Sequence, residues 1–142
     1  MSEALLFDTH IALWLDSGDA RLRQSTRLLI DDCWQQGGTV LLSAVTAWEI
    51  ALLAGAGRIG LDLPVEPRIE RFLGRPGIEA VPLGWKVAAA GYRFHHLEHR
   101  NPADRLLIAA AIDLACPLVT YDQRIQRFAH RHGRQYGFAV VS

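Results

Sequence analysis

Cysteine is scarce in this sequence, and its scarcity argues against two kinds of site. The two cysteines, Cys33 and Cys116, stand far apart. They have neither the number nor the spacing of a zinc site or of a disulfide framework. We therefore expect both to be buried free thiols.

Long hydrophobic runs are also missing. No apolar stretch approaches the ~20 residues that a membrane helix needs, and residues 1–4 contain no basic segment that leads into a cleavable apolar run. We therefore expect no membrane association and a cytoplasmic location. With 50% hydrophobic and 21% charged residues, the composition is that of a globular protein. The 142 residues fit one domain, which we expect to span residues 1–142.

Lysine is nearly absent, so the positive charge is carried by arginine. Lys86 is the only lysine, and the formal net charge is zero, which excludes a uniformly basic nucleic-acid binder. Between residues 93 and 134, however, seven arginines stand against four acids, together with five histidines. Because arginine suits phosphate contacts and stacking on bases, this stretch favours RNA binding. Arginines on the solvated faces of helices are the open alternative.

Apolar runs and helical spacings alternate along the chain. We predict strands at residues 4–7, 39–43, 78–83, 118–121 and 138–141, and helices at 11–15, 20–36, 46–54, 67–73, 85–94, 102–115 and 123–132. Strands that alternate with helices, without hairpin turn signals, indicate a parallel sheet flanked by helices. The sequence therefore predicts an α/β fold.

Four acids occupy similar places in this scheme. Asp8 ends the first strand, Glu49 lies in the first turn of the helix after the second strand, Asp104 opens the apolar helix, and Asp122 ends a later strand. The carboxyl ends of parallel strands line one edge of a sheet, where ligands bind. We therefore expect these four carboxylates to face one crevice.

Helix capping is the simpler explanation for each acid taken alone. Residues 46–49 fit a capping box, residues 101–104 resemble one with proline at the first helical position, and Asp8 and Asp122 could be N-caps. Capping does not explain why four acids should meet, since like charges ~4 Å apart repel by ~1–4 kcal/mol per pair. A bound cation removes that objection. Carboxylate oxygens without thiolates suit Mg²⁺ or Mn²⁺, and such an ion could promote hydrolysis of a phosphodiester.

Several segments together resemble a known family. They read LLFDTH at residues 5–10, WEIA at 48–51, NPADRLLIA at 101–109 and LVTYD at 118–122. In order and spacing they look like the motifs of VapC-type PIN domains, which are ribonuclease toxins of toxin–antitoxin pairs. The likeness spans almost the whole chain.

The resemblance implies a three-layer α/β/α sandwich with a central parallel sheet, and an endoribonuclease that depends on Mg²⁺ or Mn²⁺. It further implies an RNA substrate, a homodimer and inhibition by a cognate antitoxin. The family's catalytic, metal-binding acids match Asp8, Glu49, Asp104 and Asp122, and its hydroxyl positions match Thr9 and Thr120.

Two positions depart from the family's usual pattern. Leu53 stands where many relatives have lysine, and Asn101 where many have aspartate. Asparagine caps a helix as well as aspartate does, so the fold should not suffer. The missing lysine leaves an alternative open, namely a catalytically degenerate PIN domain that binds RNA or a protein without cutting RNA.

Overall fold

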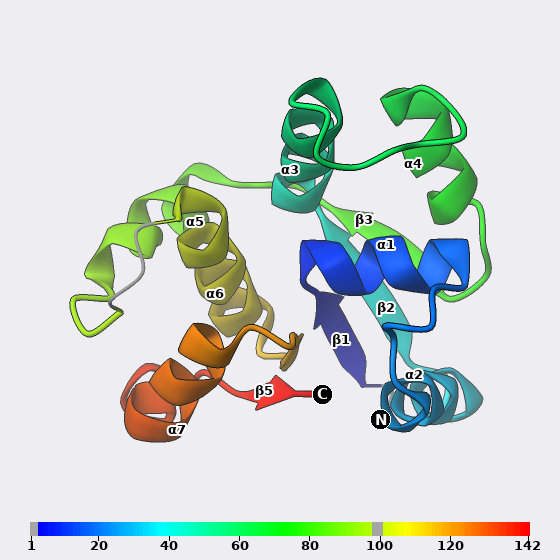
Figure 1. The fold of residues 1–142 in the computed structure, drawn as a ribbon. Coiled ribbons are helices and arrows are strands. Elements are labelled where there is room, and N and C mark those ends of the chain that lie inside the picture. The colour runs from blue at the N-terminus through cyan, green and yellow to red at the C-terminus, as the bar shows by residue number, and fades with distance from the viewer. Residues whose placement is uncertain (1–2, 98–100) are drawn as a thin grey trace.

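The sheet is parallel throughout, as the sequence predicts. The computed structural model describes residues 3–97 and 101–142. Its strands pair in the order β3-β2-β1-β4-β5, with every neighbouring pair parallel (Figure 1). Their bounds are β1 (Ala4–Phe7), β2 (Thr39–Ser43), β3 (Ile78–Val81), β4 (Leu118–Val119) and β5 (Val140–Val141).

Helices connect the strands and cover the sheet. They are α1 (Thr9–Ser17), α2 (Gln24–Gln35), α3 (Ala44–Gly55), α4 (Val65–Leu73), α5 (Trp85–Ala90), the 3₁₀ turn η1 (Gly91–Arg93), α6 (Pro102–Leu114) and α7 (Gln123–Tyr136). β2 coincides with its predicted range, and α6 ends one residue before its predicted end.

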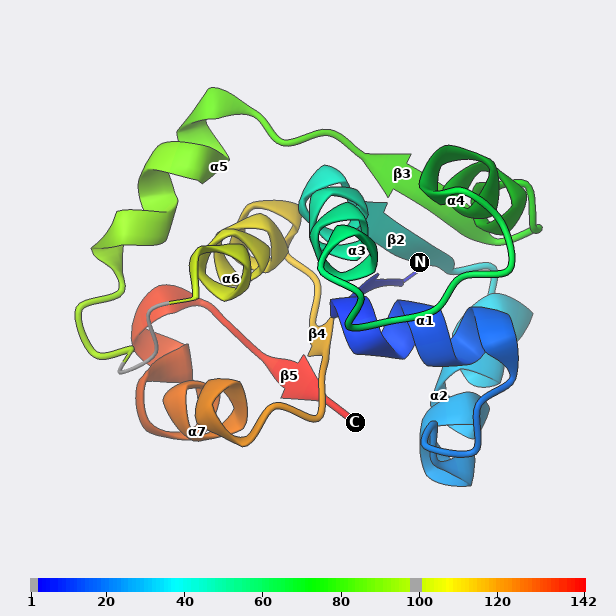
Figure 2. The same cartoon turned by 45° about the horizontal axis from the view of Figure 1, so that its top comes forward.

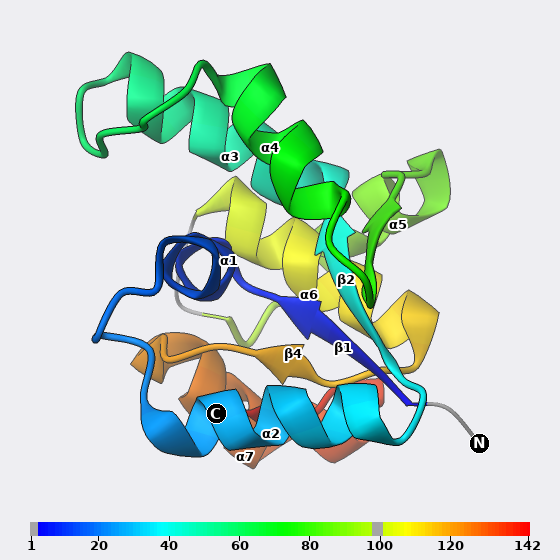
Figure 3. The same ribbon diagram turned by 90° about the vertical axis from the view of Figure 1, so that its right-hand side faces the viewer.

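Side chains of the central strands alternate between two buried clusters. Leu5 and Phe7 of β1 pack with residues of α1, α2 and α4, whereas Leu6 between them packs with residues of α6 and α7. This period of two is what a strand buried on both faces requires. The sheet therefore lies between two helical layers, and the predicted α/β/α sandwich is confirmed (Figure 3).

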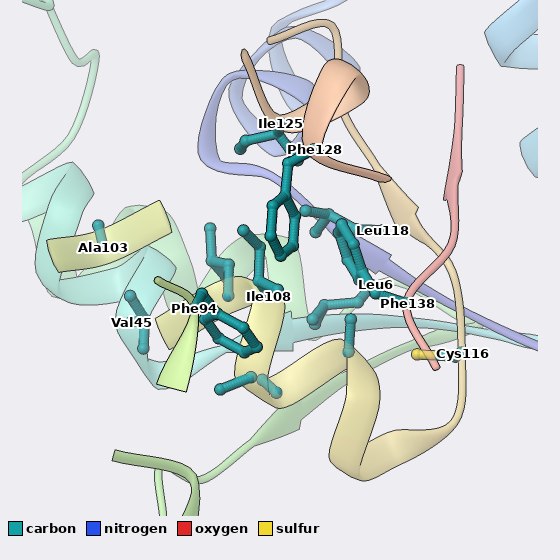
Figure 4. Close-up of a cluster of buried hydrophobic side chains, with 14 of the residues drawn as sticks. Leu6, Val45, Phe94, Ala103, Ile108, Cys116, Leu118, Ile125, Phe128 and Phe138 are labelled. Carbon is teal, nitrogen blue, oxygen red and sulfur yellow. The ribbon is translucent and has the colours of Figure 1, made fainter. Parts of the chain in front are cut away.

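The buried hydrophobic cluster around α6 holds in place the segments that contribute to the candidate functional site. Figure 4 shows Phe94, from the segment before α6, beside Ile108 of α6 and close to Phe128 of α7. The rings of Phe94 and Phe128 meet edge to face, with centroids 5.7 Å apart. Helix α6 is thus held by the sheet on one side and by these aromatic side chains on the other.

Some local predictions are wrong. Helix α2 begins at Gln24 rather than at residue 20, and the predicted helix 85–94 divides into α5 and the 3₁₀ turn η1. The predicted strands 118–121 and 138–141 shorten to two residues each, because β4 and β5 pair with each other only at two positions. Two large aromatic side chains lie on the surface, since Trp48 is 54% and Trp85 77% exposed.

Both cysteines are buried and free, as predicted. Among the helices that the structure describes, none has the length and apolar character needed to cross a membrane.

Candidate functional site

Asp8 and Thr120 meet where the two central strands end. Asp8 follows β1 and is the N-cap of α1, and its Oδ1 accepts a 2.8 Å hydrogen bond from the N–H of Thr9. Thr120 follows β4, which pairs with β1, and its hydroxyl donates to Oδ2 of Asp8 over 2.6 Å. Asp8 is therefore held from two strands, and its carboxylate lies at the carboxyl edge of the sheet, as predicted.

Thr9 brings Glu49 to the same edge. The Thr9 side chain is fully buried, and its hydroxyl donates a short hydrogen bond to Oε1 of Glu49 from α3. In Figure 2 the beginning of α1 lies between α3 and β4, which explains how residues distant in sequence meet here. Two hydroxyl groups, from Thr9 and Thr120, thus each bind one carboxylate.

The capping explanation for Glu49 is wrong, and so is its predicted place in a first turn. Helix α3 begins at Ala44, directly after β2, and Ser43 is its N-cap, with Oγ accepting from the N–H of Val45 at 3.0 Å. Thr46 therefore lies inside the helix and caps nothing. Glu49 lies farther along α3, and its carboxylate does not cap the helix.

Asp122 and Asn101 do cap helices. Asp122 is the N-cap of α7 and accepts from the N–H groups of Arg124 and Ile125 at 2.8 and 3.1 Å. Asn101 is the N-cap of α6 and accepts from the N–H of Ala103 at 3.1 Å. Asp104 follows in the first turn of α6, as predicted, and is only 6% exposed. An N-cap keeps other lone pairs of its carboxylate, so capping and ligand binding are compatible in Asp122.

The four acids share one electrostatic environment. Burial raises the pKa of Asp104 to about 8, and repulsion from Asp8, Asp122 and Glu49 contributes to the same rise. Burial also raises the pKa of Asp8, which the hydrogen bonds from Thr120 and Thr9 partly offset. Charges must lie near one another to shift a pKa by repulsion, so the structure brings into one neighbourhood the four acids that the sequence singles out.

The acids do not enclose a cation as they stand. Within residues 3–97 and 101–142, no three Asp, Glu, His or Cys side chains converge closely enough to hold a metal ion. Glu49 is turned toward Thr9, and Asp8 toward Thr120. The donor set nevertheless fits Mg²⁺ or Mn²⁺, because every group in it is a carboxyl group and none is a thiol.

The basic stretch divides into structural and exposed arginines. Arg105 is a structural residue, since its guanidinium donates to the carbonyl groups of Gly91, Phe94 and Leu97. Arg124, Arg127 and Arg131 are exposed side chains of α7, which begins at the capping Asp122. The RNA-binding interpretation therefore keeps the exposed Arg93 and the arginines of α7, while Arg100 and Glu98 lie outside the described residues.

Histidines contribute less to the site than their number suggests. His10 is exposed, and its ring lies 5.7 Å from that of Trp14. His99 lies outside the described residues.

Sequence reasoning missed Tyr121, which lies beside Asp122. Its hydroxyl accepts from the N–H of Arg23 and bonds to Thr26, and so connects α2 to this strand end. No sequence signal marks Tyr121, because its partners come from a distant helix.

The sequence is similar to a known protein family over most of its length. The model of the PIN domain matches residues 5–131. The chain belongs to the PIN-domain family. Ribonuclease VapC22 of Mycobacterium tuberculosis is 30% identical over 130 residues, which cover 92% of this chain and 94% of that protein. A relative of this identity and coverage supports the assignment independently.

Solved structures share the PIN fold. VapBC2 of Rickettsia felis, bound to a DNA fragment from its promoter, matches with a TM-score of 0.66 and 15% identity over 97% of both chains. FitAcB of Neisseria gonorrhoeae matches with a TM-score of 0.62 and 19% identity over 97% of this chain and 96% of that one. At these identities the likeness shows the fold alone.

Proposed function

We propose that this PIN domain is an endoribonuclease that depends on Mg²⁺ or Mn²⁺ and acts as the toxin of a toxin–antitoxin pair. One observation carries the proposal: Thr9 and Thr120 hold the carboxylates of Glu49 and Asp8 at the carboxyl edge of the sheet, where Asp104 and Asp122 begin the neighbouring helices α6 and α7. Burial and repulsion from the other three acids raise the pKa of Asp104 to about 8, and helix capping alone would not require that repulsion. The relative named a ribonuclease supports RNA as the substrate.

The side chains have separate duties in this proposal. Asp8, Glu49, Asp104 and Asp122 would hold the cation. When bound, it would supply charge that polarises a phosphoryl oxygen and helps to generate hydroxide from water. Thr9 and Thr120 keep the carboxylates of Glu49 and Asp8 in place through their hydroxyl hydrogen bonds. Hydrolysis then adds water across a phosphodiester bond of the RNA.

Partners follow from the family rather than from the geometry. Structures of similar fold include a toxin–antitoxin complex from Klebsiella pneumoniae, with a TM-score of 0.61. By analogy we propose a cognate antitoxin for this chain. A homodimer is likewise a proposal, and the cytoplasmic location stays a prediction.

Cleavage of RNA by the purified protein tests the proposal. We expect single-stranded RNA to be cut in the presence of Mn²⁺ and to stay intact with EDTA, with Asp8→Asn as the inactive control. Cleavage that persists in EDTA would contradict the role of the cation. Binding of RNA without cleavage in any divalent metal would instead favour the degenerate binding module.

A further inference from the structure

A small cavity is lined by five basic side chains, together with the apolar Leu97 and Phe128. It lies between the segment before α6 and helix α7, and has a volume of about 30 Å³. Its polar lining consists of His96, Arg124, Arg127, Arg131 and His132. Arg124 stands two residues after Asp122, so the basic lining begins in the first turn of the helix that Asp122 caps.

Four other arginines of the described residues form ion pairs with carboxylates, whereas these three do not. Arg68 pairs with Asp16 and Asp62, Arg71 with Asp62, Arg75 with Asp16, and Arg21 with Asp19. Among the described residues, by contrast, no acid forms an ion pair with Arg124, Arg127 or Arg131. Helix α7 itself contains four arginines and no acid. Positive charge that is gathered and left unneutralised favours an anionic ligand.

The wall of the cavity that faces α7 contains His96, and ring contacts and hydrogen bonds hold this wall in place. The rings of His96 and His132 stack with centroids 4.1 Å apart and an interplanar angle of 12°. Phe94 holds the same segment on α7 through edge contacts with Phe128 and Tyr136 at 5.7 and 5.3 Å. Arg105 donates to carbonyl groups along this segment. His96 is therefore fixed against α7, and binding a ligand here would cost little ordering.

The spacing of the arginines fits a strand of nucleic acid. They recur at intervals of three and four residues and so share one face of α7. From Arg124 to Arg131 the helix rises by about 10 Å. Stacked nucleotides of one strand rise by about 3.4 Å each, so this face spans about three nucleotides.

We propose that the face of α7 formed by Arg124, Arg127 and Arg131, together with the small cavity that it makes with His96 and His132, is a phosphate-binding subsite that holds the RNA strand on one side of the scissile bond. This inference rests on the proposed nuclease function. The arginines contact successive phosphate groups, His96 supplies a ring N–H donor from the opposite wall, and His132, stacked on His96, supplies one from α7 itself. The strand would then leave the carboxylate cluster along α7.

Binding of RNA without cleavage tests the subsite. The probe is a fluorescein-labelled single-stranded RNA of mixed sequence, measured by anisotropy in EDTA at pH 8 over a range of salt concentrations. Each lost phosphate contact lowers the slope of log K against log salt by about 0.7 for a single strand. The variant R124A/R127A/R131A should therefore lose about 2 from this slope, and His96→Ala should weaken binding with an unchanged slope.

A matched control removes the same charge elsewhere. The variant R21A/R71A/R75A also loses three arginines, but these already pair with acids, so we expect a smaller change of slope. Melting curves verify that all variants are folded. If the wild type cuts RNA while R124A/R127A/R131A keeps the wild-type slope, the subsite is wrong and the nuclease function stands. If the wild type neither binds nor cuts RNA, both proposals fail.

Discussion

Thr120 donates a 2.6 Å hydrogen bond to Asp8 and so joins the ends of two adjacent parallel strands at the carboxylate cluster. The same hydroxyl accepts from the N–H of Asp122 at 3.0 Å. One buried threonine therefore fixes two of the four acids. Its removal should affect both stability and the acids.

Replacing Thr120 with valine should destabilise the protein. The variant keeps the shape of the side chain but leaves the buried Asp8 carboxylate with one donor fewer, which costs about 1–3 kcal/mol. Urea unfolding at neutral pH, with the metal removed by EDTA, measures the difference. An unchanged free energy of unfolding would mean that the Thr120 hydroxyl does not support Asp8.

Thr46 offers a control of the same chemistry with the opposite expectation. Its hydroxyl oxygen is buried and, among the described residues, has no hydrogen-bond partner. Because a buried polar group without a partner is unfavourable, Thr46→Val should leave stability unchanged or raise it by about 1 kcal/mol. Equal losses in Thr46→Val and Thr120→Val would show that neither effect comes from hydrogen bonding.

Asp104 should make the metal-free protein less stable as pH rises. Its pKa is about 8 in the folded state and near 3.8 when unfolded, so between these values the folded chain holds a proton that the unfolded chain has lost. Stability therefore falls across this window, by at most about 1.4 kcal/mol per pH unit. In EDTA, Asp104→Asn should melt above the wild type at pH 8, and the gap should close toward pH 4. A gap that does not depend on pH would contradict the raised pKa.

Mn²⁺ should stabilise the wild type through the same cluster. A cation that binds only the folded state adds RT ln(1 + [L]/Kd), about 2.7 kcal/mol at a hundredfold excess over Kd. We expect a rise in melting temperature with millimolar Mn²⁺, and its loss in Asp104→Asn. Mg²⁺ and Ca²⁺ serve as comparison ions. A wild type that melts at one temperature with and without Mn²⁺ would argue against a metal site.

Arg105 should control the order of the segment that holds His96. Lysine keeps its charge but cannot donate to the carbonyl groups of Gly91, Phe94 and Leu97 with one planar group. Arg105→Lys should therefore speed hydrogen exchange at residues 91–97 and leave exchange in β1 and β2 unchanged. Protection equal to the wild type in this segment would refute the structural role of Arg105.

The positions of strands and helices could be predicted because buried hydrophobic residues recur with a different period in each kind of element. The alternation of Leu5, Leu6 and Phe7 between two cores is legible in the sequence. The residue at which α3 begins could not be predicted from the sequence. Both Ser43 and Thr46 are good N-caps, and only the end of β2 decides between them. The N-cap preferences of single residues allow several starting points for a helix, and the place where the preceding strand ends determines which one is used.

The meeting of the four acids was predictable from topology, but their hydrogen bonds were not. Parallel strands with acids at their ends converge whatever the side-chain rotamers are. The hydrogen bond from Thr9 to Glu49 depends on packing between segments distant in sequence. So do the hydrogen bonds that Arg105 donates to three carbonyl groups. The exposure of Trp48 and Trp85 belongs to the same class, because hydrophobicity alone does not place a residue in a core.

Single-turnover cleavage of RNA by Asp104→Asn tests the central claim most directly. The control is Asn101→Asp, which keeps a good N-cap for α6 and adds an acid instead of removing one. With Mn²⁺ present, we expect Asp104→Asn to be folded and nearly inactive, and Asn101→Asp to cut RNA at least as fast as the wild type. Cleavage by Asp104→Asn at a near wild-type rate would contradict the assignment of this carboxylate cluster as the catalytic site.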